Sequence, residues 1–131
     1  MIVLDTHALV FWVSDPNKLS SEARSMINQA FKKKTVYVST ISVWEIAMLV
    51  TKGRLMLTMD VESWLDKVEN LPGIQFVPMD TAIARKSVML PGTLHPDPAD
   101  RIIIATARQL GATLITSDQK IRSYKHVKTL W

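Results

Sequence analysis

Short apolar runs alternate with longer helical patterns, and this alternation is the feature that most limits how the chain can fold. Runs rich in apolar and β-branched residues are expected to form strands at Ile2–Leu4, Val36–Val38, Ile74–Val77 and Thr113–Ile115, with a last edge strand at His126–Thr129. Strands separated by helices predict an α/β domain with a mostly parallel sheet of about five strands. Because the runs are mostly continuous rather than alternating, we expect helices to cover both faces of the sheet.

The helical segments carry recognisable end signals. Asp97 followed by Pro98 is typical of a helix start, with Asp97 as the cap and Pro98 at the first helical position. This helix is expected to end at Gly111. Ile41–Thr51 is apolar almost throughout and is expected to be a buried helix, and the four tryptophans and seven methionines are expected to lie mostly in the core. The expected helices span about 20–33, 41–51, 60–70, 80–90 and 97–111, with a short helical turn after Asp118.

Composition excludes several classes of protein. The 131 residues suit one domain, expected to span 1–131. With no cysteine there is no disulfide scaffold, zinc ribbon or cysteine nucleophile. No window holds the ~20 apolar residues that a membrane span needs. The apolar start lacks the basic leading region of a signal peptide, so we expect a soluble, cytoplasmic protein without a membrane partner.

Three acids, Asp5, Glu45 and Asp118, stand alone in apolar surroundings, and Asp100, in the first turn of a strongly apolar expected helix, is the fourth candidate. Asp5 and Asp118 follow the first and fourth expected strands, whereas Glu45 and Asp100 lie on expected helices that could lean over the same sheet edge. Ligands of open parallel sheets bind at the carboxyl ends of the strands. Isolated acids are costly to bury without a partner, and four converging carboxylates repel one another. A site built from carboxylates alone prefers Mg²⁺ or Mn²⁺, one or two ions of which can activate water against a phosphodiester.

The charge balance agrees with a polyanionic substrate. The chain carries 16 basic residues and 12 acids, for a net charge of +4. If four acids form one site, eight remain against 16 basic residues, and the rest of the surface carries +8. An acidic cleft in a basic surface is the arrangement that a nuclease needs, because the basic surface holds phosphates.

Four segments together resemble a known family. They are Val3-Leu4-Asp5-Thr6-His7, Ser42-Val43-Trp44-Glu45-Ile46-Ala47 with Lys52-Gly53-Arg54-Leu55 after it, His95-Pro96-Asp97-Pro98-Ala99-Asp100-Arg101, and Leu114-Ile115-Thr116-Ser117-Asp118. In this order they resemble the PIN domain, and more narrowly the VapC-type ribonuclease toxins of bacterial toxin–antitoxin pairs. The resemblance covers nearly the whole chain, from Ile2 to Trp131.

The resemblance implies a three-layer α/β/α sandwich and a Mg²⁺- or Mn²⁺-dependent endoribonuclease. It implies that Asp5, Glu45, Asp100 and Asp118 are both catalytic and metal-binding. It also implies an RNA substrate, a homodimer and a small cognate antitoxin that holds the toxin inactive.

Simpler explanations and other functions stay open beside this one. Asp5 and Asp118 could merely cap helices, and Asp100 is favourable in a first helical turn in any case. Thr6 and Thr116 could orient a carboxylate or be ordinary caps, and Arg101 could grip a phosphate or pair with an acid. The main alternative function is a PIN-like module that binds RNA or protein without catalysis. A small-molecule phosphatase is less favoured, because no glycine-rich phosphate loop is present.

Overall fold

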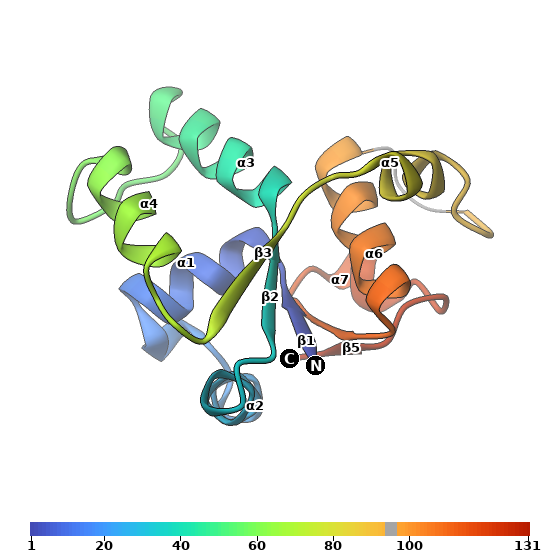
Figure 1. Ribbon diagram of the computed structural model, residues 1–131, viewed down its shortest axis with the longest axis horizontal. Coiled ribbons are helices and arrows are strands. Elements are labelled where there is room, and N and C mark those ends of the chain that lie inside the picture. Colours follow the sequence, from blue (N-terminus) through green and yellow to red (C-terminus); the bar gives the residue numbers. More distant parts are fainter. Residues whose placement is uncertain (94–96) are drawn as a thin grey trace.

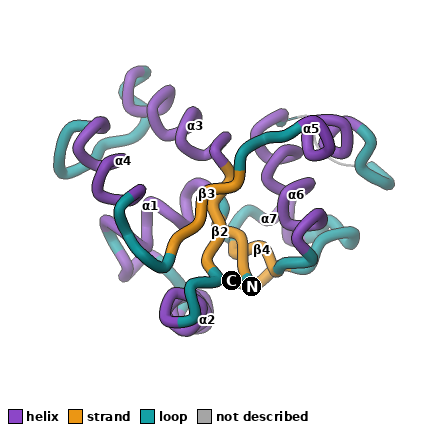
Figure 2. Tube along the Cα trace, in the orientation of Figure 1, coloured by secondary structure: helices purple, strands orange, loops and turns teal. Residues whose placement is uncertain are grey.

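A parallel sheet with helices on both sides forms the centre of the computed structural model, which describes residues 1–93 and 97–131 (Figures 1 and 2). His95 and Pro96 of the third sequence segment therefore lie outside the described residues. The strands are β1 (Ile2–Leu4), β2 (Val36–Ser39), β3 (Ile74–Val77), β4 (Thr113–Ile115) and β5 (Thr129–Leu130). The helices are α1 (Thr6–Ser14), the 3-10 turn η1 (Pro16–Lys18), α2 (Ser21–Lys32), α3 (Thr40–Thr51), α4 (Val61–Glu69), α5 (Thr81–Val88), α6 (Pro98–Leu110) and α7 (Gln119–Arg122).

The sheet has the order β3-β2-β1-β4-β5, and every pair of neighbouring strands is parallel. The predicted five-stranded α/β sheet is thus confirmed. The last strand lies at the edge as expected, but it begins at Thr129 rather than at His126. The sequence analysis assigned no helix to residues 6–14, which form α1. That segment is too uniformly apolar to show a helical period, and its helix begins at Asp5, whose side chain accepts a hydrogen bond from the Thr6 amide.

Two apolar clusters hold the layers together. The larger one joins one face of the sheet to helices α1 to α4, and Trp64 is among its largest fully buried side chains. The smaller one joins the other face to α6 and α7 around Ile103, Ile104 and Leu114. Helix α5 packs on α6 (Figure 1). None of the helices in the described residues is long and apolar enough to cross a bilayer.

Several apolar side chains that were expected in the core lie at the surface instead. In α3 only Ser42 and Ile46 are fully buried, so the prediction of a buried helix was wrong. Trp44 is 58% exposed and Met56 is 92% exposed, and three more methionines on later segments, Met59, Met79 and Met89, are also exposed. A helix that is apolar on all sides does not reveal in its sequence which side faces the core.

Replacing Gly73 with alanine should destabilise the fold, because this glycine permits a close approach between β3 and α2. A Cβ atom at Gly73 would lie 2.3 Å from Phe31 Cδ1 and 2.6 Å from the Phe31 carbonyl oxygen, which is backbone and cannot rotate away. We expect a loss of about 1–3 kcal/mol in the free energy of unfolding, measured by urea denaturation. Gly53→Asn is the control, since nothing lies within 4 Å and asparagine tolerates its positive φ. Equal, small losses in both variants would contradict this account.

Candidate active site

The buried carboxylate of Asp5 lies where the central strand ends. The backbone ladder continues one residue past β1, because the Asp5 amide donates to the Ile115 carbonyl oxygen at 3.0 Å. This brings Asp5 beside Thr116, the residue after β4, and the Thr116 hydroxyl donates to Asp5 Oδ2 at 2.7 Å. Asp5 Oδ1 accepts from the Thr6 amide at 2.8 Å. Both oxygens of the carboxylate are therefore held in place by residues at the carboxyl ends of neighbouring strands.

Burial raises the pKa of Asp5 above its ordinary value, and this effect outweighs the hydrogen bonds from Thr116 and Thr6 that lower it. The neighbouring charges also act, with His7 lowering the pKa of Asp5 and Asp118 raising it. Only 7% of Asp5 is exposed. A carboxylate in such surroundings is unfavourable when ionised unless a cation accompanies it.

Side-chain hydroxyl groups connect Thr6, the residue after Asp5, to helix α3. The oxygens of the Thr6 and Ser42 side chains lie 2.9 Å apart, and both residues are buried. The Thr6 side chain also donates a hydrogen bond to Glu45, which lowers the pKa of Glu45, although burial of Glu45 raises that pKa by more. Because a carboxylate can only accept, the Thr6 proton goes to Glu45, and the Ser42 hydroxyl must then donate to Thr6. Ser42 was not among the residues predicted for the site, although its place three residues before Glu45 put it within reach of the same neighbours.

Asp100 shows most clearly that the acids converge. Burial, followed by repulsion from Asp5, Asp97, Asp118 and Glu45, raises the pKa of Asp100 to about 8. Asp100 thus interacts with each of the other three predicted acids, which come from β1, α3 and the turn after β4. Charges influence one another this strongly only at short range or through a poorly hydrated space. The structure therefore brings the four predicted acids together at one edge of the sheet.

Asp97 belongs to the same cluster, although the sequence analysis assigned it only a capping role. Its side chain does cap α6, accepting from the Asp100 amide at 3.1 Å. Its charge also raises the pKa values of Glu45 and Asp100. In the sequence nothing separates this acid from an ordinary helix cap.

The capping explanations for Asp5 and Asp118 are also correct as far as they go. Asp118 accepts from the Lys120 amide at 2.9 Å and begins α7, just as Asp5 begins α1. The Asp118 amide in turn donates to the Thr116 hydroxyl at 3.1 Å. A cap uses only part of a carboxylate, so a cap can also serve in a site.

The Arg101 side chain forms hydrogen bonds with the backbone of α5. Its Nε donates to the Ser87 carbonyl oxygen at 2.9 Å and its Nη2 to the Val88 carbonyl oxygen at 3.1 Å. These are carbonyls at the end of α5, which lack partners within their own helix. This geometry favours a role in holding α5 against α6, and the predicted phosphate contact of Arg101 stays a prediction.

The donor set of the cluster fits a hard divalent cation, because it consists of carboxylates whose mutual repulsion such an ion would relieve. Within residues 1–93 and 97–131, however, no three acidic or histidine side chains are already arranged to hold an ion. Side-chain rotation would have to bring the carboxylates closer together. Asp5 is fixed on both oxygens, so Glu45, Asp100 and Asp118 are the side chains that would move toward it.

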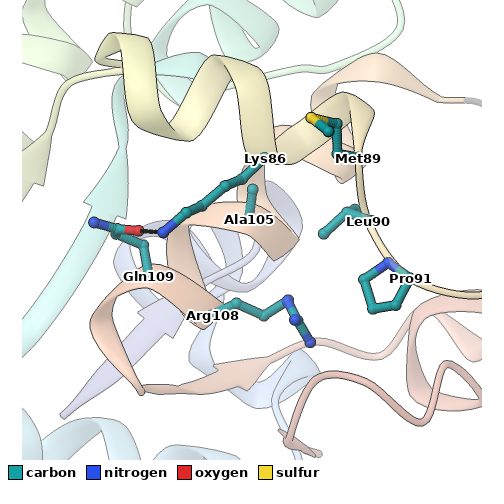
Figure 3. Close-up of a pocket in the computed structure, with 7 residues that line it drawn as sticks. All are labelled: Lys86, Met89, Leu90, Pro91, Ala105, Arg108 and Gln109. Carbon is teal, nitrogen blue, oxygen red and sulfur yellow. Dashed lines mark hydrogen bonds between the residues drawn. The ribbon is translucent and has the colours of Figure 1, made fainter.

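A separate cavity of about 200 Å³ lies between α5 and α6 but contains none of these acids (Figure 3). Its polar side chains are engaged with the protein itself. Lys86 donates to the Gln109 side chain, and Arg108 donates to the His126 carbonyl oxygen. This cavity offers no group for catalysis, and the acid cluster remains the candidate active site.

The fold and the cluster together define a class of α/β protein with an acidic site at the carboxyl edge of a fully parallel sheet. The family model of the PIN domain matches residues 2–127, and the chain belongs to the PIN-domain family. It is also similar to "Ribonuclease VapC22" of Mycobacterium tuberculosis, with 34% identity over 99% of this chain and 98% of the relative.

Solved structures share the fold. FitAcB from Neisseria gonorrhoeae is 21% identical with a TM-score of 0.72, and the match covers 100% of this chain and 97% of that one. A toxin–antitoxin complex from Klebsiella pneumoniae contains a chain that is 22% identical with a TM-score of 0.62, covering 97% and 95%. The resemblance to the PIN domain that the sequence motifs indicated is thus confirmed, and so is the predicted sandwich fold.

The Thr6→Val variant should break the side-chain hydrogen bonds between the start of α1 and α3. Valine has a similar shape but leaves the buried Ser42 hydroxyl without its partner, which costs about 1–3 kcal/mol in the free energy of unfolding. It also removes the hydrogen bond that lowers the pKa of Glu45, so that pKa should rise. Urea denaturation and NMR titration of the Glu45 carboxyl carbon measure the two effects. The control is Thr51→Val, which removes an exposed hydroxyl group from α3. A Glu45 pKa that stays unchanged in Thr6→Val would refute the hydrogen bond from Thr6 to Glu45.

The metal-free protein should lose stability as the pH rises from about 4 to about 8. The pKa of Asp100 lies near 8 in the folded chain and near 3.8 in the unfolded chain, so folding favours the protonated form. This stabilisation is complete at pH values below the pKa of the unfolded chain. It is lost as the pH rises to the pKa of the folded chain. Asp100→Asn should therefore flatten the profile of Tm against pH measured in chelator. The control Asp66→Asn, on the exposed side of α4, should retain the wild-type slope. If Asp100→Asn keeps the wild-type slope of Tm against pH, the charges of the other acids do not act on Asp100.

Proposed function

We propose that this chain is a metal-dependent endoribonuclease, the toxin of a toxin–antitoxin pair. The observation that carries the proposal is the buried Asp5 carboxylate at the carboxyl ends of β1 and β4, which Thr116 and the Thr6 amide hold in place and whose charge interacts with those of Asp118 and Asp100. Such a cluster is unfavourable by itself and becomes favourable with a divalent cation bound. Supporting it are membership of the PIN-domain family and the 34% identity to a relative named as a ribonuclease.

In this proposal Asp5, Glu45, Asp100 and Asp118 hold one or two Mg²⁺ or Mn²⁺ ions. Bound there, such ions would supply an activated water and stabilise the leaving oxygen of a phosphodiester. The chain's own residues prepare the site. Thr116 and the Thr6 amide fix the orientation of Asp5, and the Thr6 hydroxyl orients Glu45. The excess of basic residues elsewhere on the chain would hold the RNA backbone across the site.

The proposed partners are a small antitoxin and a second copy of this chain. The antitoxin is proposed from the likeness to a chain of a toxin–antitoxin complex. Val88 and Met89 at the end of α5 are both exposed by more than 70%, and they provide apolar surface for a homodimer. Native mass spectrometry after expression with the neighbouring reading frames tests both partners at once. We propose that the enzyme acts in the cytoplasm, where its RNA substrate is found.

Asp5→Asn should abolish RNA cleavage while leaving the chain folded, because the amide is nearly the same size but carries no charge for a cation. Purified protein is incubated with total cellular RNA in Mg²⁺, in Mn²⁺ or in chelator, and the fragment ends are sequenced. We expect discrete fragments from the wild type with either metal, none in chelator, and a rate at least about 100-fold lower for Asp5→Asn.

Asp66→Asn, which changes an exposed acid remote from the site, controls for a general loss of charge. Circular dichroism confirms folding of each variant. Cleavage by Asp5→Asn at the wild-type rate, or wild-type cleavage that persists in chelator, would contradict the proposed mechanism. Binding of RNA without any cleavage, in protein shown by mass to be free of a second chain, would favour the non-catalytic binding module instead.

A further inference from the structure

A groove between α3 and α6 lies directly beside the acid cluster. Its volume is about 350 Å³, near the lower end of the roughly 300–1,000 Å³ that is usual for small-ligand pockets. One wall is formed by α3 and the other by the first turns of α6. The residues that line it are Ile41, Trp44, Glu45, Met48, Asp97, Pro98, Ala99 and Ile102.

The α3 wall follows from the period of the helix. Four residues share one face of α3, because they lie at positions i, i+3, i+4 and i+7 of the helix: Ile41, Trp44, Glu45 and Met48. The opposite face carries Ser42 and Ile46 and is buried in the fold. The groove face is only partly covered by the core, since Ile41 packs against the smaller apolar cluster whereas Trp44 is 58% exposed. A large aromatic surface of this kind is unfavourable in water and calls for a partner.

We propose that this groove binds one unpaired nucleobase of the RNA, stacked on the indole of Trp44, next to the phosphodiester that is cut. The inference rests on the proposed ribonuclease function and adds a substrate-positioning residue to it. Glu45 belongs both to the acid cluster and to the wall of the groove, so an RNA strand with its phosphate at the acids reaches the groove within about one nucleotide.

The chemistry of the groove selects a base over the other parts of an RNA. Its walls are mostly apolar, and Asp97, which is not among the proposed metal ligands, repels phosphate. A nucleobase is flat, uncharged and carries N–H donors that a carboxylate can accept. Aromatic side chains bind unpaired bases by stacking in many RNA-binding sites, and this happens in loops, where bases are not held in a helix. We therefore infer that the substrate is cut in a single-stranded segment.

The test compares Trp44→Ala and Trp44→Phe with Met56→Ala, which removes a 92% exposed methionine from the turn between α3 and α4. Binding of a short, unstructured, fluorescein-labelled RNA is measured by anisotropy in the Asp5→Asn background, so that the RNA is not cut. Cleavage is measured by single-turnover kinetics with Asp5 intact. We expect Trp44→Ala to lose roughly 10- to 100-fold in both affinity and cleavage efficiency. Trp44→Phe should stay within about fivefold of the wild type, and Met56→Ala should be unchanged.

Substrates with a single abasic nucleotide on either side of the cut bond identify the stacked base. When the abasic nucleotide is at the position that Trp44 contacts, the RNA affinity and cleavage efficiency of the wild type should fall to those of Trp44→Ala. The Trp44→Ala variant should lose neither affinity nor efficiency at that position. Equal losses in both proteins at every position would overturn the proposal.

The remaining outcomes separate this inference from the proposed function. If the wild type cuts RNA and Trp44→Ala cuts and binds it equally well, the base site is wrong and the ribonuclease stands. If Trp44→Ala cuts normally but no longer retains a co-purified small protein, the groove is a protein-docking surface, which also overturns the base site. If the wild type neither cuts nor binds RNA, the ribonuclease proposal fails and the base site fails with it.

Discussion

The structure depends most on one buried carboxylate at the end of its central strand. Asp5 lies where β1 meets β4, and its two oxygens accept hydrogen bonds from Thr116 and from the Thr6 amide. The same residue begins α1, so the sheet, the first helix and the candidate site share a single group. Burying this charge costs free energy of folding, and hydrogen bonds recover only part of it, since the pKa of Asp5 remains raised. The fold therefore carries a local conflict that a cation would resolve, and such conflicts are typical of functional sites.

The parallel sheet explains why acids that are distant in sequence meet. Every strand of a parallel sheet ends at the same edge, so the residues that follow β1 and β4 become neighbours. Helix α3 follows β2 directly, which puts Glu45 above that edge, and Asp97 fixes the start of α6 so that Asp100 faces it. The starts of α1, α6 and α7 donate backbone N–H groups to Asp5, Asp97 and Asp118, which partly offsets the repulsion between the acids.

Much of this arrangement is readable from the sequence because it depends on local signals. Asp5 and Asp118 stand out as lone acids after apolar strands, and Glu45 has no inexpensive structural role in an apolar helix. Other features depend on tertiary contacts that leave no local trace. Ser42 is an ordinary helical serine until the fold places it beside Thr6. Asp97 acts on Glu45 and Asp100 but is indistinguishable from a cap, and Arg101 is committed to the carbonyls at the end of α5.

Helix α3 is a second case in which the sequence did not predict the tertiary arrangement. Its sequence is apolar on nearly every side, which predicted complete burial, yet only Ser42 and Ile46 are fully buried. The other face carries Trp44, which is 58% exposed. That face continues from Glu45 into the groove against α6. One helix thus contributes an acid to the candidate site and an aromatic surface beside it, and the proposed base site depends on this pairing.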